Sequence, residues 1–128
     1  MTVPKLCNQV IVAANIAAVA EGLMLAKKAG VDPETVLDAI KGGLAGSTVM
    51  NAKGPMMIDN NTKPGFKIAL HIKDLNNAME TGHRVGSPLP LTSVTMEMMQ
   101  RLNADGLGQC DHSALAKWYE KLASETIY

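Results

Sequence analysis

The stretch PKLCNQVIVAANIAAVAEGLMLAKK, residues 4–28, decides the fold, because it reads as one long helix that is apolar on nearly all sides. Pro4 suits the first turn of a helix, where its missing N–H costs nothing. Lys27 and Lys28 favour the C-terminal end of the helix dipole, and Gly30 follows as a stop signal. A helix apolar on all sides is normally surrounded by protein. The sequence therefore predicts a central, buried helix from about Pro4 to Lys28.

Five shorter helices are predicted after it. Asp32 is a helix N-cap followed by proline and an acid, and that helix ends at Gly42 and Gly43. Ser47 caps a short helix that runs to about Lys53, where Pro55 interrupts or restarts the chain. Three further helices are expected at about 67–84, 91–103 and 113–123, the last one capped by Asp111. The apolar positions expected to face the core are Val36, Leu37 and Ile40; Ile68, Ile72, Leu75 and Met79; Val94, Met98, Met99 and Leu102; and Leu115, Trp118, Tyr119 and Leu122.

Composition fits a single globular, all-α domain. Hydrophobic residues make up 47% of the 128 residues and only four are aromatic, so the core must be built from aliphatics, alanine and the nine methionines. The formal net charge is zero, with no run of like charges, so a nucleic-acid-binding protein is not indicated. The most apolar stretch, Val10 to Ala20, is shorter than the roughly 20 residues that span a bilayer. Cys7 and Cys110 make no disulfide framework, which favours a reduced, cytoplasmic chain.

A polar stripe interrupts the apolar first helix. Lys5, Asn8, Gln9 and Asn15 lie near one face of it, together with Val12. Buried polar groups need partners, which are either other side chains or a ligand. Two interpretations stay open: Lys5 is a solvated residue at a frayed helix end, or it is a lysine poised beside amides that hold a polar substrate.

The other candidate sites are weaker on residue pattern alone. Lys73, Asn77, Glu80 and Arg84 share a helix face that is typical of a solvated surface. The segment 42–47 has the composition of a phosphate loop but no preceding strand and no Walker lysine. His71, His83 and His112 have no ligand spacing, so no metal site is predicted.

Five blocks of the chain resemble the β-hydroxyacid dehydrogenase family. They are residues 5–10 (KLCNQV), 42–47 (GGLAGS), 63–66 (KPGF), 71–75 (HIKDL) and 104–108 (ADGLG). The first is similar to the lysine motif that opens the family's long helix. The last four resemble the branch of tartronate semialdehyde (2-hydroxy-3-oxopropionate) reductases, near relatives of the 3-hydroxyisobutyrate dehydrogenases. The resemblance covers essentially the whole chain, and it implies a helical domain like the C-terminal part of 6-phosphogluconate dehydrogenase, with a long first helix.

The resemblance also implies roles for individual residues. Lys5 would donate a proton to the substrate oxygen as hydride arrives from the nicotinamide, and Asn8 and Gln9 would hold the substrate oxygens. Lys73 would approach the cofactor, with Phe66 packing near the nicotinamide and Asp74 supporting the site. Many relatives have asparagine where this chain has Gln9, which leaves the separate roles of the two amides open.

Domain organisation is implied in the same way. Residues 1–128 would be the C-terminal substrate and dimerisation domain of an NAD(P)H-dependent enzyme that reduces tartronate semialdehyde to glycerate. No Rossmann fingerprint occurs in the sequence, so we expect the isolated chain to be inactive and to bind no cofactor tightly. The expected partners are further copies of the chain, as a dimer or tetramer, and a small hydroxyacid or aldehyde; neither nucleic acid nor a membrane is expected. The alternatives are a 3-hydroxyisobutyrate dehydrogenase domain, a non-catalytic helical oligomerisation module, or an independent ligand-binding helical protein.

Overall fold

The computed structural model describes residues 2–128; Met1, where the predicted helical domain begins, lies outside them. These residues form six α-helices and two short helical turns, and no strand. This confirms the predicted all-α class, including the long first helix. The elements are α1 (Val3–Lys28), α2 (Pro33–Ile40), α3 (Thr48–Ile58), α4 (Ile68–Val85), α5 (Pro90–Leu102), the π-helical turn η1 (Asn103–Leu107), the 3₁₀ turn η2 (His112–Leu115) and α6 (Ala116–Ala123).

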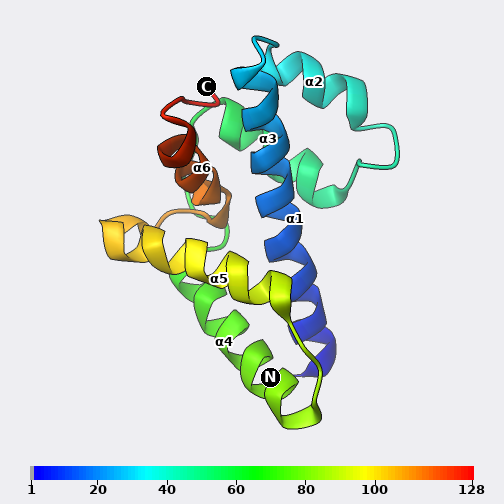
Figure 1. Ribbon diagram of the computed structural model, residues 1–128, viewed down its shortest axis with the longest axis vertical. Coiled ribbons are helices and arrows are strands. Elements are labelled where there is room, and N and C mark those ends of the chain that lie inside the picture. Colours follow the sequence, from blue (N-terminus) through cyan, green and yellow to red (C-terminus); the bar gives the residue numbers. More distant parts are fainter. Residues whose placement is uncertain (1) are drawn as a thin grey trace.

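Helix α1 is the axis of the molecule and contacts all five other α-helices (Figure 1). Helices α4 and α5 lie along its N-terminal half, α2 and α3 lie beside its C-terminal half, and α6 covers a third side (Figure 1). The core is aliphatic, as the composition requires: Ile16 and Leu23 of α1 meet Leu75 of α4, Met99 of α5 and Leu115 of η2, all of them almost fully buried. The Lys5 end of α1 therefore faces α4 and not α2 or α3.

One side of α1 is left uncovered in this chain. Ile11 is 64% exposed and Leu25 is 72% exposed, and the exposed Ala18 and Gly22 lie between them on the same side of the helix. We call these four residues the α1 stripe. The prediction that protein surrounds the whole helix is thus wrong within this chain. By length and composition α1 could cross a membrane, but half of that window is buried against the other helices, as in the core helix of a folded domain.

Helix α3 does not stop before Pro55, which corrects the expected break at that residue. Ser47 caps the helix as predicted, since its hydroxyl accepts a hydrogen bond from the Met50 N–H at 2.9 Å. The helix then continues to Ile58 with Pro55 inside it. The residue before Pro55 is Gly54, which has no Cβ to crowd the proline ring and lies so close to Leu37 that an added Cβ would be 3.0 Å from its methyl carbons. This packing against Leu37 outweighs the one backbone hydrogen bond that the proline removes.

Three positions predicted to face the core lie at the surface instead: Ile40, Val94 and Leu122 are 39%, 60% and 62% exposed. On α5 the buried residues are Thr92, Thr95, Met99 and Leu102. Because this set also has helical spacing, α5 is turned by about a sixth of a revolution relative to the predicted face. Thr92 and Thr95 occupy core positions on α5, whereas a prediction based only on apolar residues placed Val94 there.

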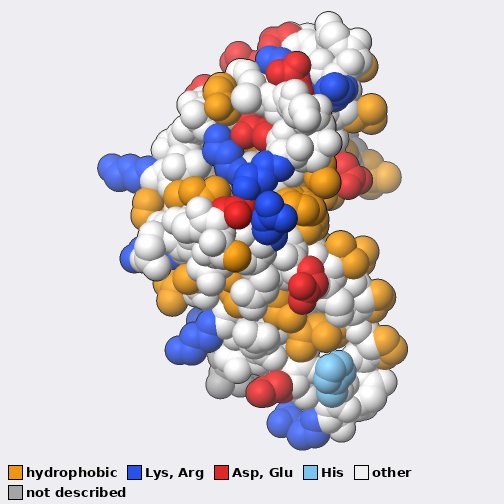
Figure 2. Space-filling model, turned by 60° about the vertical axis from the view of Figure 1, so that its left-hand side comes forward, with side chains coloured by type: hydrophobic (Ala, Val, Ile, Leu, Met, Phe, Trp, Pro, Cys, Tyr) orange, Lys and Arg blue, Asp and Glu red, His pale blue; other side chains and the backbone are white. Residues whose placement is uncertain are grey.

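Charged side chains hold α6 and the last residues in place. Figure 2 shows Lys and Arg side chains gathered on this face with acidic side chains among them. Lys117 pairs with Glu120 at 3.3 Å, Asp105 in η1 pairs with Lys121, and Lys27 Nζ donates a hydrogen bond to the Tyr128 carbonyl at 3.2 Å. These surface contacts have mixed sign, so they form no basic patch on this face.

Candidate active site

Gln9 is the centre of the polar contacts between α1 and α4. Its side-chain amide nitrogen donates a hydrogen bond to Asp74 Oδ2 at 2.8 Å, and both residues are buried, each with 7% exposure. Its amide oxygen accepts a hydrogen bond from Asn8 Nδ2 at 3.0 Å. Gln9 lies on the inner face of α1 and Asp74 on the inner face of α4, so the bond crosses the helix interface. Three residues that the sequence selected, Asn8, Gln9 and Asp74, thus form one polar chain.

The two predicted lysines lie on the surface beside this polar chain. Lys5 is exposed and precedes Gln9 by one helical turn, so the two residues lie on the same side of α1. Lys73 is exposed and directly precedes Asp74 on α4. Within residues 2–128 neither ammonium group forms an ion pair. Of the predicted polar stripe, Lys5 and Asn8 are therefore exposed, while Gln9 is buried and Asn15 is half-buried, accepting a hydrogen bond from the Ser47 hydroxyl at 3.2 Å.

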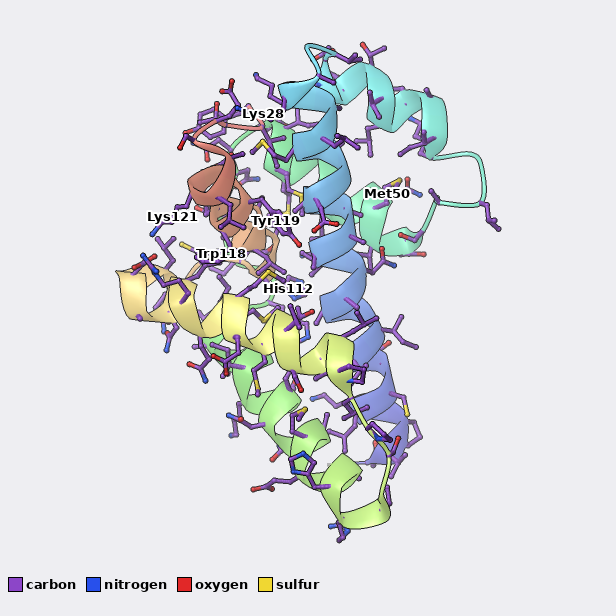
Figure 3. All side chains as sticks on the ribbon, in the orientation of Figure 1. Lys28, Met50, His112, Trp118, Tyr119 and Lys121 are labelled. Atoms are coloured by element: carbon purple, nitrogen blue, oxygen red, sulfur yellow. The ribbon has the colours of Figure 1, made fainter. Side chains whose placement is uncertain are left out.

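Beneath the polar chain lies a pair of buried histidines to which the sequence assigned no role. The Nδ1 atoms of His71 and His112 are 2.8 Å apart, and His71 Nε2 lies 3.0 Å from the backbone carbonyl oxygen of Gln9. The half-buried Phe66 ring packs against both imidazoles, with ring centroids 5.6 Å and 5.4 Å away. Figure 3 shows His112 at the centre of the molecule, among α1, α5 and α6. Phe66 thus touches the site through the histidines.

Asp111 anchors the segment that leads into α4. Its carboxylate is fully buried and accepts hydrogen bonds from the backbone N–H groups of Gly65 and Phe66, each at 2.9 Å, and of Ser113 at 3.0 Å. Lys53 of α3 pairs with it at 3.1 Å. Burial raises the pKa of Asp111, but the hydrogen bonds from Phe66 and Ser113 outweigh this and hold it well below its ordinary value. The carboxylate therefore stays ionised and fixes the backbone on which Phe66 is carried.

Acid is expected to destabilise the chain through His112. Burial, with Lys53 and His71 acting in the same direction, lowers the pKa of His112 from 6.5 to about 4. Between these two pKa values the unfolded chain binds a proton that the folded chain does not bind. The contribution of neutral His112 to the free energy of unfolding is therefore complete above about pH 6.5 and is lost as the pH falls through about 4. The shift corresponds to roughly 3 kcal/mol in the free energy of unfolding. Urea unfolding at a series of pH values will measure it.

The control for this prediction is the exposed histidine of α4. His83→Asn should leave the pH dependence of the unfolding free energy unchanged, whereas His112→Asn should flatten it, because asparagine does not titrate. Equal slopes for His112→Asn and the unmodified chain between pH 6.5 and 4 would show that His112 is not the responsible group.

The structure thus brings five residues into one connected group and leaves the two predicted lysines at its solvent-exposed edge. Asn8, Gln9 and Asp74 are bonded in series, and Phe66 reaches them through His71. Lys5 and Lys73 flank this group on the solvent side. In the described part of the chain no three His, Cys, Asp or Glu side chains lie close enough to hold a metal ion. A polar surface with two cations suits a small oxygen-rich ligand and a nucleotide.

Comparison with known proteins gives a match over almost the entire chain. Residues 2–119 match the family model described as the NAD-binding domain of NADP-dependent 3-hydroxyisobutyrate dehydrogenase. The chain is 44% identical to 2-hydroxy-3-oxopropionate reductase of Escherichia coli over 123 residues, which are 96% of this chain and 42% of that protein. It is 33% identical to 2-(hydroxymethyl)glutarate dehydrogenase of Eubacterium barkeri over 124 residues, 96% of this chain and 41% of that protein.

Solved structures agree with the sequence matches. A 3-hydroxyisobutyrate dehydrogenase from Salmonella typhimurium superimposes with a TM-score of 0.83 at 27% identity, covering 88% of this chain and 40% of that one. The Mycobacterium tuberculosis enzyme of the same name, solved with L-serine, superimposes with a TM-score of 0.82 at 30% identity, covering 89% of this chain and 41% of that one. The chain spans about two fifths of the length of these relatives. It belongs to the family of NAD-binding helical domains of the 3-hydroxyisobutyrate dehydrogenase type.

Proposed function

We propose that this chain supplies the proton donor and the substrate-binding surface of an NAD(P)H-dependent reductase that converts tartronate semialdehyde into glycerate. The observation that carries the proposal is the turn of α1 from Lys5 to Gln9. It exposes an ammonium group and an amide, and it is fixed from beneath by the Gln9–Asp74 hydrogen bond. The 44% identity to 2-hydroxy-3-oxopropionate reductase supports this choice of substrate within the family.

The chemistry assigned to Lys5 is proton donation. When hydride adds to the aldehyde carbon of the substrate, the C=O π electrons move to oxygen and make an alkoxide. The Lys5 ammonium group donates one proton to that oxygen, which yields the alcohol and leaves a neutral amine that solvent reprotonates. Lys5 is exposed in this chain, so solvent protons reach it freely. Its role is general acid catalysis.

The two amides take different roles in this proposal. Gln9 is buried and both ends of its amide are occupied, the nitrogen by Asp74 and the oxygen by Asn8. Asn8 is exposed and keeps its amide oxygen available. We therefore assign the direct contact with the substrate's polar groups to Asn8 and the support of that contact to Gln9. Asp74 orients the Gln9 amide from the opposite helix.

The residues on α4 and before it fit a nicotinamide dinucleotide. Lys73 presents an exposed cation that suits the phosphate or ribose oxygens, and the half-buried Phe66 presents an aromatic surface that suits the nicotinamide ring. NAD(P)H supplies the hydride when it is bound. The contribution of this chain is to present Lys73 and Phe66 to the cofactor, with Asp111 fixing the Phe66 backbone.

The chain alone is proposed to be inactive, because nothing in it encloses Lys5 and Asn8. The groove between α1 and α4, about 340 Å³ in volume, is lined by neither of them but mainly by apolar side chains such as Leu6, Val10 and Val85. It suits contact with protein better than binding of a charged hydroxyacid. Proton donation needs a hydride donor in fixed geometry on the other side of the substrate.

A chimera tests the proposed function. In the Escherichia coli 2-hydroxy-3-oxopropionate reductase, the matching 42% of the enzyme is replaced by this chain. We expect this chimera to oxidise NADH or NADPH in the presence of tartronate semialdehyde. We expect the 128-residue chain alone to oxidise neither cofactor. Turnover of 3-hydroxyisobutyrate without turnover of tartronate semialdehyde would favour the 3-hydroxyisobutyrate dehydrogenase alternative. Turnover by the isolated chain would refute its inactivity.

A second role, in assembly of the protein, is favoured by the α1 stripe. Two large apolar side chains, Ile11 and Leu25, are exposed with the small residues Ala18 and Gly22 between them. Small residues allow two helices to approach closely, and large exposed apolar groups gain by being covered. We propose that two copies of the chain pack α1 against α1 along this stripe, as a dimer or as half of a tetramer.

Charged substitutions on the stripe are expected to give monomers. Ile11→Glu with Leu25→Glu should halve the molar mass measured by light scattering and leave the helical circular dichroism signal unchanged, because both side chains already lie in solvent within one copy. Val94→Glu on α5, at 60% exposure, is the matched control and should not change the mass. A monomeric unmodified chain at high concentration, or a dimer that survives both substitutions, would contradict the proposal.

The cellular setting proposed is the cytoplasm. Cys7 is exposed and Cys110 is partly buried, and in the described part of the chain both are free thiols. Free thiols are typical of a reducing compartment.

A further inference from the structure

The geometry of the buried histidine pair determines where its protons lie. The carbonyl oxygen of Gln9 can only accept, so His71 Nε2, 3.0 Å away, carries a proton and donates it. A neutral His71 then has a bare lone pair on Nδ1. The 2.8 Å contact between the two Nδ1 atoms needs one proton between them, which His112 must provide. His112 is therefore the Nδ1–H tautomer, with an unprotonated Nε2.

Helix α4 holds Gln9 at two points. His71 binds its backbone carbonyl, and Asp74, three residues further along the same face of α4, binds its side-chain amide. The two bonds fix both the position of the α1 turn and the rotation of the Gln9 amide. Asn8, which donates to that amide at 3.0 Å, takes its orientation from it. A change at His71 or His112 is thereby passed to the exposed residue proposed to touch substrate.

We propose that His71 and His112 are a positioning pair for the substrate-binding turn of α1, and that a second proton on the pair releases Gln9 and weakens substrate binding. The consequence for the reaction rests on the proposed function. The contacts that fix Gln9 do not depend on the proposed function, because they lie within this chain.

The surroundings keep the pair neutral near neutral pH. His71 is fully buried and His112 is 5% exposed. The charged groups that act on them are Asp74 on α4, Lys53 on α3 and Asp111 ahead of η2; Lys53 lowers both pKa values, while Asp74 raises that of His71 and Asp111 that of His112. The Phe66 ring, edge-on to His71 and tilted against His112, covers that side of the pair. Burial dominates and lowers both pKa values.

Protonation of both rings is incompatible with the observed contact. His112 can take a proton on Nε2 and still donate through Nδ1. A proton on Nδ1 of His71 would point at the Nδ1–H of His112 across 2.8 Å, which places two donors against each other. The rings must then separate, and His71 leaves the Gln9 carbonyl. The pair thus tolerates one added proton and opens with two.

Nitrogen NMR of the 128-residue chain tests the arrangement directly. At about pH 7 we expect His71 to be protonated on Nε2 and His112 on Nδ1, with a scalar coupling between the two Nδ1 nitrogens across the hydrogen bond. We also expect the Gln9 side-chain NH₂ protons to exchange slowly with solvent, and to exchange faster as acid opens the pair. A proton found on Nε2 of neutral His112, or no coupling between the rings, would overturn the proposal.

Three variants separate positioning from bulk stability. His112→Asn puts an amide nitrogen where imidazole Nδ1 stands, keeps the donor, and can turn its oxygen toward a protonated His71. His112→Gln puts the amide at the place of Nε2 and loses the contact. His83→Asn removes the exposed histidine of α4 and is the matched control. We expect slow Gln9 exchange in His83→Asn, slow exchange even in acid in His112→Asn, and fast exchange at every pH in His112→Gln.

The chimera provides the functional readout. With the unmodified chain, KM for tartronate semialdehyde should stay level between about pH 7 and pH 5 and rise about tenfold as the pH falls below about 4. Over the same range kcat should change less than about threefold, because the second proton disturbs substrate binding and not the proton donor. His112→Asn should remove that rise and His83→Asn should keep it. Identical KM profiles for His112→Asn and the unmodified chain would overturn the proposal.

If the chimera turns over no substrate at all, the proposed function fails, and Gln9 exchange in the isolated chain still decides the role of the histidines. If His112→Gln does not fold, the comparison of His112→Asn with the unmodified chain decides it.

Discussion

Lys5→Ala in the chimera is expected to lower kcat/KM for tartronate semialdehyde by about 10²–10⁴, the usual contribution of a general acid. The loss should fall mainly on kcat, because the ammonium group acts on the alkoxide that forms in the transition state and not on the aldehyde that binds. Lys5 is exposed and contributes little packing, so the melting temperature of the isolated chain should stay the same. Stopped-time assays of NAD(P)H oxidation with varied substrate measure both constants.

The control for this prediction is a lysine at the other end of the molecule. Lys41, which follows α2, is exposed and pairs with Asp38 of that helix. Its replacement by alanine should change the free energy of unfolding by less than about 0.5 kcal/mol and leave kcat unchanged. Lys5→Arg keeps the positive charge and cannot release a proton, so it should be as slow as Lys5→Ala. A loss smaller than about tenfold for Lys5→Ala would remove Lys5 from the role of acid.

Asp111→Ala is expected to destabilise the chain by about 3–5 kcal/mol, a large part of the stability of a small domain. The substitution removes a fully buried carboxylate, which leaves Lys53 without its ion pair and the backbone N–H groups of Gly65, Phe66 and Ser113 without their acceptor. Urea unfolding followed by circular dichroism measures the loss. Because Phe66 is carried on the released segment, NAD(P)H binding by the chimera should weaken as well.

A double-mutant cycle shows whether Asp111 acts through Lys53. Lys53→Met removes the partly buried cation and keeps its aliphatic stem, and combined with Asp111→Ala it should cost less than the sum of the two single changes. Asp111→Asn retains one acceptor oxygen and should be less harmful than Asp111→Ala. Additive losses, or a loss below about 1 kcal/mol for Asp111→Ala, would mean that the amides find other partners.

The helix ends were predictable to within a residue or two where a cap marks them. Asp32 and Ser47 each accept a backbone N–H at the start of the helix that the sequence assigned to them. Asp111 caps the 3₁₀ turn η2, and the α-helix predicted from residue 113 begins only after that turn, at Ala116. The prediction was wrong where tertiary packing overrides a local signal. Pro55 stays inside α3 because Gly54 lies against Leu37, and Val94 lies in solvent because Thr92 and Thr95 took the buried face of α5.

The candidate site divides in the same way. Lys5, Asn8, Gln9, Phe66, Lys73 and Asp74 could be selected from short blocks, since each block resembles a family motif. The resemblance did not select His71 and His112, although both lie in or near those blocks, because a buried hydrogen-bonded pair has no sequence spacing of its own. Their signal was two histidines in an otherwise apolar setting, which is also typical of satisfied core residues.

The sequence by itself determined the all-helical class, the long α1 and the residues from which an oxidoreductase site is proposed. It could do so because caps, prolines and a period of 3.6 residues act within one or two helical turns. Only the tertiary structure decided that Gln9 bonds to Asp74, 65 residues away, and that His71 bonds to His112, 41 residues away. It also decided that α1, apolar all round, has one uncovered side. These depend on how six helices share one core, and no stretch of the chain contains that information alone.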